Sequence, residues 1–247
     1  MTDYRHSHTK LGTGQKYAES FSQWSYRNYI WEWEKSVLNE ILAKYIHASN
    51  FIHHLDFACG TGRVLAHLGG HVAESTGVDI SGDMLSAARH NVNGANLIEA
   101  DLTTHNILVG QEFNIITAFR FFLNAQPELR TGAFAILSDL LSEDGYLVFN
   151  VHMNRSSLTA RFLRGYGKLR GLRQPTFNQL SIDEISSMLQ ESNLEIVDMY
   201  QHGVFPIVNE DTRIPISIIS SVDAVASRIK FLSNLSRYQI FVCKKAV

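Results

Sequence analysis

The sequence predicts an α/β protein: a doubly wound parallel sheet with helices on both faces. Two observations support this prediction. Between about residues 51 and 152, short apolar segments of strand length alternate with segments of helical periodicity. Three of the predicted strands also end near an acidic residue, and two glycines follow the first of these acids. Strands that alternate with helices form parallel sheets, whose ligands bind beyond the carboxyl ends of the strands.

The composition is that of a globular protein. The chain has 247 residues, 45% of them apolar, which is enough for one sizeable domain with a full core. The net charge of −2 argues against a long nucleic acid as the main partner. Cys59 and Cys243 show no metal-ligand spacing and fit a reducing compartment. Because the start is polar and no apolar run could span a bilayer, we expect a cytoplasmic protein without a transmembrane segment.

The predicted elements follow in order. A polar start leads into a helical pattern over Tyr17–Ser49, rich in aromatic residues, so residues 1–50 are predicted to form an N-terminal helical cap. The turn Glu143-Asp144-Gly145 is predicted to precede the fifth strand. The other predicted strands and helices are Phe51–Phe57, Gly62–Leu68, Ser75–Ile80, Gly82–His90, Asn96–Glu99, Phe113–Ala118, Glu128–Leu141, Tyr146–His152, Ser181–Glu191, Leu194–Tyr200 and Tyr238–Lys244.

Two segments interrupt this alternation. The regular pattern lapses over Asn154–Pro175, which holds six basic residues and no acidic one, and Thr212–Leu235 has only a partly helical pattern. We expect cap insertions near 154–180 and 203–235 in a Rossmann-like domain of residues 51–247. The arginines between 155 and 173 suit the phosphate or carboxylate of an anionic acceptor. A solvated helix with one charged face is the alternative interpretation.

The stretch LDFACGTGR, residues 55–63, closes the first predicted strand and opens a helix. Gly60 and Gly62 allow a sharp turn and close approach of a ligand to the backbone. A dinucleotide fingerprint would have a third glycine where Leu65 stands, and no Lys-Ser or Lys-Thr pair follows as a P-loop requires. Asp56 suits a cationic group of a ligand better than a pyrophosphate. Taken alone, the motif could also be a structural turn.

Two further acids follow the next strands. Asp79 in GVDIS is placed to accept hydrogen bonds from both hydroxyls of a ribose. Asp101 in EADL is placed to accept a hydrogen bond from an adenine amino group, while Leu102 packs on the ring. Each could also be an ordinary capping or loop carboxylate, but the three motifs in order favour an adenosine ligand.

Together these motifs resemble those of the class I S-adenosylmethionine-dependent methyltransferases. LDFACGTG resembles the glycine-rich motif of that family, with Ala58 in place of its first glycine, a departure that predicts a negative φ at residue 58. GVDISGDML resembles the ribose motif, EADL the adenine motif, and LLSEDGYLVFNV the turn and fifth strand. TAFRFFLN resembles the segment after the fourth strand in bacterial small-molecule members. The resemblance spans roughly residues 51–151.

The resemblance implies a seven-stranded sheet of order 3-2-1-4-5-7-6 with an antiparallel last strand. It implies S-adenosyl-L-methionine as cofactor and S-adenosyl-L-homocysteine as product. Asp56 would face the ammonium of the cofactor, Asp79 its ribose, and Asp101 the edge of its adenine. The complete set of implied cofactor residues is Tyr17, Asp56, Ala58, Cys59, Gly60, Gly62, Asp79, Ile80, Met84, Asp101, Leu102, Ala118 and Phe119.

The acceptor side is less defined by the sequence. His152 follows the fifth strand and could serve as a general base for a hydroxyl acceptor, or be a structural loop histidine. Arg120 and Asn124 could orient the acceptor, or Arg120 could form a salt bridge with a lid. No carboxylate set indicates a metal site, and the motifs of adenine-N6 and cytosine-C5 methyltransferases are absent from the sequence.

The sequence therefore predicts methyl transfer to a small molecule, at oxygen or nitrogen. One alternative is a non-catalytic protein that binds S-adenosylmethionine or S-adenosylhomocysteine. A second is an NAD(P)-dependent oxidoreductase, which Asp56 and the missing third glycine disfavour. The sequence does not identify the acceptor or the oligomeric state.

Overall fold

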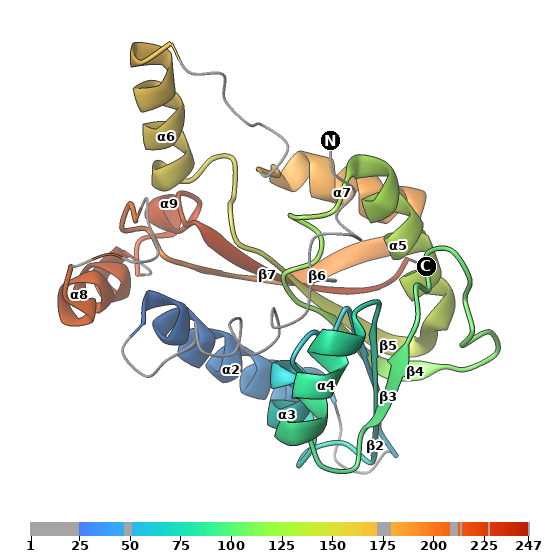
Figure 1. Ribbon diagram of the computed structural model, residues 1–247. Coiled ribbons are helices and arrows are strands. Elements are labelled where there is room, and N and C mark those ends of the chain that lie inside the picture. The colour runs from blue at the N-terminus through green and yellow to red at the C-terminus, as the bar shows by residue number, and fades with distance from the viewer. Residues whose placement is uncertain are drawn as a thin grey trace.

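A computed structural model describes residues 25–46, 51–171, 179–207, 212, 214–226 and 228–246. Seven strands form one mixed sheet of order β3-β2-β1-β4-β5-β7-β6 (Figure 1). Strands β1 to β5 pair in parallel, and β7 runs antiparallel to both β5 and β6. The predicted fold class, strand order and antiparallel last strand are therefore confirmed. The strands are β1 His53–Phe57, β2 Glu74–Asp79, β3 Asn96–Glu99, β4 Phe113–Ala118, β5 Leu141–Val151, β6 Leu194–His202 and β7 Tyr238–Lys245.

Helices cover both faces of the sheet (Figure 1). Side chains that alternate along the central strands enter two separate apolar clusters, because successive strand residues point to opposite faces. On one face, Phe149 packs with side chains of α5 and α7, and on the other Val148 packs with α2 and α3. The helices are α2 Tyr26–Tyr45, α3 Arg63–Leu68, α4 Gly82–Asn91, α5 Pro127–Leu140, α6 Leu158–Leu169, α7 Ile182–Glu191, α8 Ile216–Ala226 and α9 Lys230–Ser233.

The start of β5 differs from the prediction. The sequence predicts a turn at residues 143–145, whereas the structure includes these residues in a strand that begins at Leu141. The pairing with β4 shifts inside this stretch, from Phe113 opposite Leu141 to Ile115 opposite Tyr146. Gly145 fits because a Cβ there would lie 2.9 Å from the carbonyl oxygen of Phe113. The turn residues thus form a bulge within the sheet rather than a break before it.

The segment after β5 contains a helix, as one of the two interpretations of its sequence predicts. Where the regular pattern lapses, the structure has the helix α6, whose first turn is capped by the Ser157 hydroxyl accepting a hydrogen bond from the backbone N–H of Ala160. The predicted division into a cap of residues 1–50 and a domain of residues 51–247 stays a prediction, and residues 1–24 lie outside the described ranges. Among the described helices, none is long and apolar enough to cross a membrane.

Candidate active site

A cavity lies beyond the carboxyl ends of β1, β2 and β4, at the point where the strand order reverses between β1 and β4. Ligands of doubly wound sheets bind at such points. Gly62, Ala118 and His152 do not line this cavity, and Tyr17 lies outside the described residues. The predicted residues that do line it are Asp56, Ala58, Cys59, Gly60, Asp79, Ile80, Met84, Asp101, Leu102, Phe119, Arg120 and Asn124.

Asp56 is the most buried carboxylate of the cavity. Its Oδ1 accepts a 2.7 Å hydrogen bond from the hydroxyl of Thr117, which sits one strand away on β4. Its Oδ2 is buried and has no hydrogen-bond partner among the described residues. Burial raises the pKa of Asp56 to about 7, against the opposing effects of the Thr117 hydrogen bond and the positive charge of Arg63. A cationic ligand group at Oδ2 would satisfy this oxygen and lower the pKa.

Asp79 fixes the glycine-rich loop to the end of β2. Its Oδ2 accepts the backbone N–H of Gly60 at 2.8 Å, and its Oδ1 accepts the backbone N–H of Ser81 at 2.9 Å. The backbone N–H of Cys59 also bonds the carbonyl of Val78 on the same strand, at 3.0 Å. Each carboxylate oxygen can accept more than one hydrogen bond, so Asp79 keeps capacity for ligand hydroxyls.

The loop between β1 and α3 passes through the left-handed region three times. Ala58 has φ +55°, Gly60 +55° and Gly62 +75°. The negative φ that the sequence predicts for Ala58 is therefore wrong: the turn out of β1 requires a left-handed residue there, and a non-glycine residue adopts it at a cost. Such strain is held in place by its surroundings, which here include the cavity wall.

The position of the missing third glycine is filled by packing. Leu65 on α3 is buried in a small apolar cluster with Cys59 and Leu85. Gly77 on β2 makes room for it, since a Cβ at residue 77 would lie 2.5 Å from Cδ1 of Leu65. A dinucleotide fingerprint has its small residue on the helix, at the position of Leu65. Here the small residue is Gly77 on the neighbouring strand.

The third acidic residue lies on the loop after β3. Oδ1 of Asp101 accepts hydrogen bonds from the backbone N–H and the hydroxyl of Thr103, which holds the loop in a turn. The backbone N–H of Ala100 bonds the carbonyl of Asp79 at 3.1 Å, so this loop lies beside the end of β2. Three carboxylates therefore border one cavity, with the guanidinium of Arg63 near Asp56.

Comparison with known proteins agrees with this geometry. A family model described as "Methyltransferase domain" matches residues 55–145, the stretch that contains all three acidic motifs. A magnesium protoporphyrin IX methyltransferase from Synechocystis PCC 6803 with bound SAM is 13% identical, with a TM-score of 0.62 over 100% of this chain and 99% of the other. A search of curated proteins gives no match. Residues 55–145 therefore match a methyltransferase domain, and the whole chain has the fold of an S-adenosylmethionine-dependent methyltransferase.

Other solved structures share the fold of this methyltransferase. An S-adenosylmethionine-dependent methyltransferase from Clostridium acetobutylicum ATCC 824 is 15% identical, with a TM-score of 0.59 over 94% of this chain and 99% of the other. A protein from Thermotoga maritima, described as a possible histamine N-methyltransferase, is 14% identical, with a TM-score of 0.61 over 94% of this chain and 95% of the other. At these identities the likeness concerns the fold.

The cavity of the methyltransferase fits S-adenosylmethionine, the cofactor of the family. That cofactor carries an ammonium and a sulfonium. The buried Oδ2 of Asp56 has no hydrogen-bond partner among the described residues, so a cationic ligand group there would compensate its burial. The three carboxylates would repel a pyrophosphate, so the electrostatics disfavour the NAD(P) alternative. No group of His, Cys, Asp and Glu within the described ranges is arranged to hold a metal ion.

The acceptor side of the methyltransferase is organised around Arg120. This residue follows β4 with φ +65°, and its backbone N–H bonds Oδ1 of Asn150 on β5 at 2.7 Å. Its carbonyl accepts the side-chain amide of Asn124 at 2.6 Å. Its guanidinium lies 3.4 Å from Oε1 of the fully buried Glu34 on α2, and Asn150 donates to the same oxygen at 2.7 Å. Arg120 is thus paired with the N-terminal helix, the alternative that the sequence left open.

His152 lies just past the end of β5, outside the cavity lining. Burial and the nearby charges of Arg120, Arg237 and Arg27 lower its pKa well below the usual value for histidine. The ring is therefore neutral at physiological pH, and its Nδ1 is buried without a hydrogen-bond partner among the described residues. Its role as a general base stays a prediction.

Three contributors to the site were not singled out from the sequence. Thr117 is a polar residue in the buried run IITAF, a signal that could have been noticed. Arg63 begins α3, stacks on Trp31 with its Cζ 4.6 Å from the ring centroid, and lines the cavity. Glu34 reaches Arg120 from a distant part of the chain, and no local pattern marks it.

Proposed function

We propose that this methyltransferase transfers the methyl group of S-adenosylmethionine to an oxygen or nitrogen atom of a small-molecule acceptor. Names of structural neighbours support the small-molecule class: one acts on magnesium protoporphyrin IX, and another is described as a possible histamine N-methyltransferase. The same fold also occurs in a ribosomal protein L11 methylase. The fold alone therefore does not distinguish a small-molecule methyl acceptor from a protein, and the residues that would contact the acceptor have to be tested.

The observation that carries the proposal is the unpartnered, buried Oδ2 of Asp56 in a cavity with three carboxylates. We assign Asp56 to the cofactor ammonium, Asp79 to the ribose, and Asp101 with Leu102 to the adenine. Ile80 and Met84, which line the same wall, would contact the adenine face. Ala58, Cys59, Gly60 and Gly62 form the loop beside the methionine moiety.

The cofactor, when bound, supplies a methyl group already activated on a sulfonium. The protein then contributes mainly by positioning the acceptor and excluding water. Phe119 lines the cavity beside the proposed reacting end of the cofactor, and Phe121 and Asn124, which line the same cavity, would form the acceptor wall. The predicted cap of residues 1–50, 154–180 and 203–235 stays a proposal, and residues 1–24, 47–50, 172–178, 208–211, 213 and 227 of it lie outside the described ranges.

An anionic acceptor gains no support from the basic segment. Arg155 pairs with Glu184 on α7 at 2.8 Å, and Arg164 donates to the side-chain oxygen of Gln179 at 2.9 Å. Neither arginine lines the cavity, and Arg120 is paired with Glu34. The acceptor that best fits these contacts is neutral or carries a positive charge.

Calorimetric titration with S-adenosylhomocysteine tests the cofactor assignment. We expect Asp56→Asn and Asp79→Ala to weaken binding roughly ten- to hundredfold, the range expected for losing a hydrogen bond to a charged group. Asp139→Asn, an exposed carboxylate on α5, is the matched control and should bind normally. Unchanged affinity in both site variants would contradict the assignment.

Transfer of a labelled methyl group tests the reaction. The purified protein would be offered S-adenosylmethionine with panels of phenols, amines and carboxylic acids. We expect label in at least one low-molecular-weight product. Label found only in added protein or RNA would contradict the small-molecule proposal, and cofactor binding without any transfer would favour the non-catalytic alternative.

A further inference from the structure

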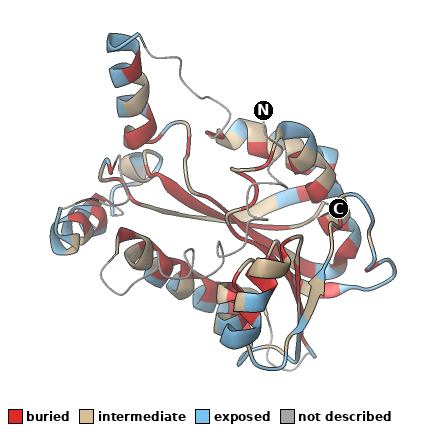
Figure 2. Ribbon diagram, viewed as in Figure 1, coloured by how far each residue is buried: buried red, intermediate tan, exposed pale blue. Residues whose placement is uncertain are grey.

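One end of the molecule exposes apolar side chains in regular stripes. The helices α6, α9 and α8 gather at this end, on the left of Figure 1. On α6 the exposed large apolar residues are Phe162, Tyr166 and Leu169, with Leu169 91% exposed. On α8 they are Ile218, Val222 and Val225, and on α9 Phe231 is 74% exposed. Figure 2 colours parts of α6 and α8 as exposed.

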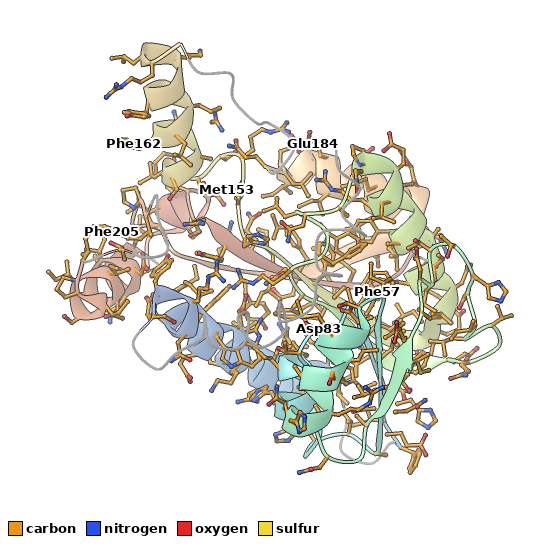
Figure 3. The ribbon with its side chains drawn as sticks, in the orientation of Figure 1. Phe57, Asp83, Met153, Phe162, Glu184 and Phe205 are labelled. Carbon is orange, nitrogen blue, oxygen red and sulfur yellow. The ribbon has the colours of Figure 1, made fainter. Side chains whose placement is uncertain are left out.

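The spacing of the apolar residues on α6 places them on its outward side. Phe162, Tyr166 and Leu169 are spaced i, i+4, i+7 and so share one side of the helix. Of the three buried residues of α6, Ala160 and Gly167 fall on the opposite side at about 100° per residue, while Thr159 lies in the first turn on the side of the stripe. Small residues therefore face the body of the protein, and large apolar ones face away from it. Figure 3 shows Phe162 projecting from α6.

Exposed basic residues flank this stripe. Arg161 and Lys168 lie along one edge of it, and Arg170 follows the helix with its guanidinium 5.5 Å from the ring centroid of Tyr166. No acidic residue occurs between residues 145 and 182 of the sequence. The helix is therefore amphipathic, and its charges have one sign.

The stripe on α8 carries no exposed charge of its own. Asp223 is the single acidic residue of α8, and it is turned inward. Its Oδ1 accepts the backbone N–H of Phe205 at 3.0 Å, and its Oδ2 accepts the hydroxyl of Tyr29 on α2 at 3.3 Å. Ile218, Val222 and Val225 again follow the i, i+4, i+7 spacing, so their common side is apolar.

We propose that α6, α8 and α9 form a docking surface for a lipid bilayer that contains anionic lipids. Several large apolar side chains exposed at one end of a protein mark an interaction site. The bilayer interface accepts aromatic and aliphatic side chains, while Arg and Lys beside them reach anionic headgroups. A symmetric contact with a second copy would bring the same positive charges together, which opposes self-association through this face. Docking here involves the surface only, since none of the described helices could span the bilayer.

Vesicle flotation tests this proposal directly. The full chain would be mixed with vesicles of phosphatidylcholine alone, or of phosphatidylcholine with phosphatidylglycerol. We expect binding to the anionic vesicles that weakens with added salt, and little binding to the neutral ones. Lys168→Glu and Arg161→Glu should each weaken it roughly tenfold. Arg89→Glu, an exposed arginine on α4, is the matched charge control and should bind normally.

A second pair of variants tests the apolar contribution. Phe162→Ser with Leu169→Ser should lower vesicle binding, whereas Phe51→Ser with Val109→Ser, two exposed apolar residues elsewhere, should not. Thermal stabilisation by S-adenosylhomocysteine should be equal in all variants, which shows that the fold and cofactor site are intact. Absence of binding to anionic vesicles would overturn the proposal, and so would equal losses of binding in the control variants. Formation of a dimer or an RNA complex through this face, instead of vesicle binding, would also overturn it.

Discussion

The hydroxyl of Thr117 donates a hydrogen bond to Oδ1 of Asp56 at 2.7 Å, across the pair of strands where the sheet order reverses. Nε2 of His54 lies 2.8 Å from the same hydroxyl oxygen. Because the hydroxyl hydrogen points to Asp56, the ring of His54 must donate. Burial lowers the pKa of His54 to about 3, so this ring is neutral. The hydrogen bonds from His54 to Thr117 and from Thr117 to Asp56 thus occupy one carboxylate oxygen of Asp56. The other oxygen is left for a ligand.

The first prediction concerns pH. Only the ionised form of Asp56 pairs with an ammonium, and its pKa is about 7 in the free protein. Affinity for S-adenosylhomocysteine should therefore rise with pH up to about 7 and level off above it. The stability of the free protein has the opposite sign: a raised pKa means that stability falls as pH rises toward 7. Titration calorimetry at several pH values measures the first effect, and urea unfolding measures the second.

Thr117→Val sharpens this test. The substitution removes the hydrogen bond that lowers the pKa of Asp56, so the midpoint of the binding curve should move to higher pH. In Asp56→Asn the pH dependence around 7 should disappear. A midpoint unchanged by Thr117→Val would mean that another group titrates.

The second prediction separates the two glycines of the loop. A Cβ at Gly60 would meet no protein atom within 4 Å, and this residue lines the cavity. A Cβ at Gly62 would lie 3.0 Å from Cγ1 of Val92 and 3.2 Å from Cβ of Ala88. Both have positive φ, so each alanine adds about 1–2 kcal/mol of strain. Gly62→Ala should lose more unfolding free energy, and Gly60→Ala more affinity for S-adenosylhomocysteine. The reverse ranking would show that Gly62 is the residue closer to the ligand.

The third prediction concerns Ala58. Glycine adopts φ +55° without the cost that alanine has there, although it also makes the unfolded chain more flexible. Ala58→Gly should therefore raise the free energy of unfolding by up to about 1 kcal/mol. Asn193→Gly, at φ +56° and far from the cavity, is the comparison. Because asparagine tolerates the left-handed region better than alanine, its gain should be smaller. Urea denaturation measures both, and a loss of stability in Ala58→Gly would contradict the strain argument.

The fourth prediction concerns the contact between α2 and the end of β4. Glu34→Leu removes the carboxylate that faces the guanidinium of Arg120, which should cost about 3 kcal/mol of stability. The double variant Glu34→Leu with Arg120→Leu should recover part of this loss, because it removes both charges. A double-mutant cycle by chemical denaturation gives the coupling energy. Additive losses would show that the pair contributes nothing.

Local signals explain what the sequence could predict. Each acidic motif stands at the end of an apolar strand, so the three loops and the order of elements follow from short stretches. Ser181 illustrates this well: its capping box with Glu184 is visible in the sequence and present in the structure. Ser81 likewise caps α4, because its hydroxyl accepts a hydrogen bond from the backbone N–H of Met84.

Tertiary packing explains what the sequence could not predict. Glu34 and Arg120 meet only after the chain has folded, so no spacing pattern joins them. Gly165 and Gly167 lower the helix propensity of α6, so the sequence left this segment open between an irregular insertion and a solvated helix, and the structure has the helix. The φ of Ala58 is set by the turn out of β1, which the residue type alone does not reveal.

The close fit of Leu65 against Gly77 has a consequence for how this loop could change. Giving the loop a third glycine would empty a buried space, which is costly in itself, and filling that space from the strand would need a second change at Gly77. Either substitution alone would lower the stability of the protein without creating a dinucleotide site. A substitution at Leu65 or Gly77 therefore changes both the ligand-binding loop and the packing of the core. A variant with only one of the two substitutions would be less stable than the present protein.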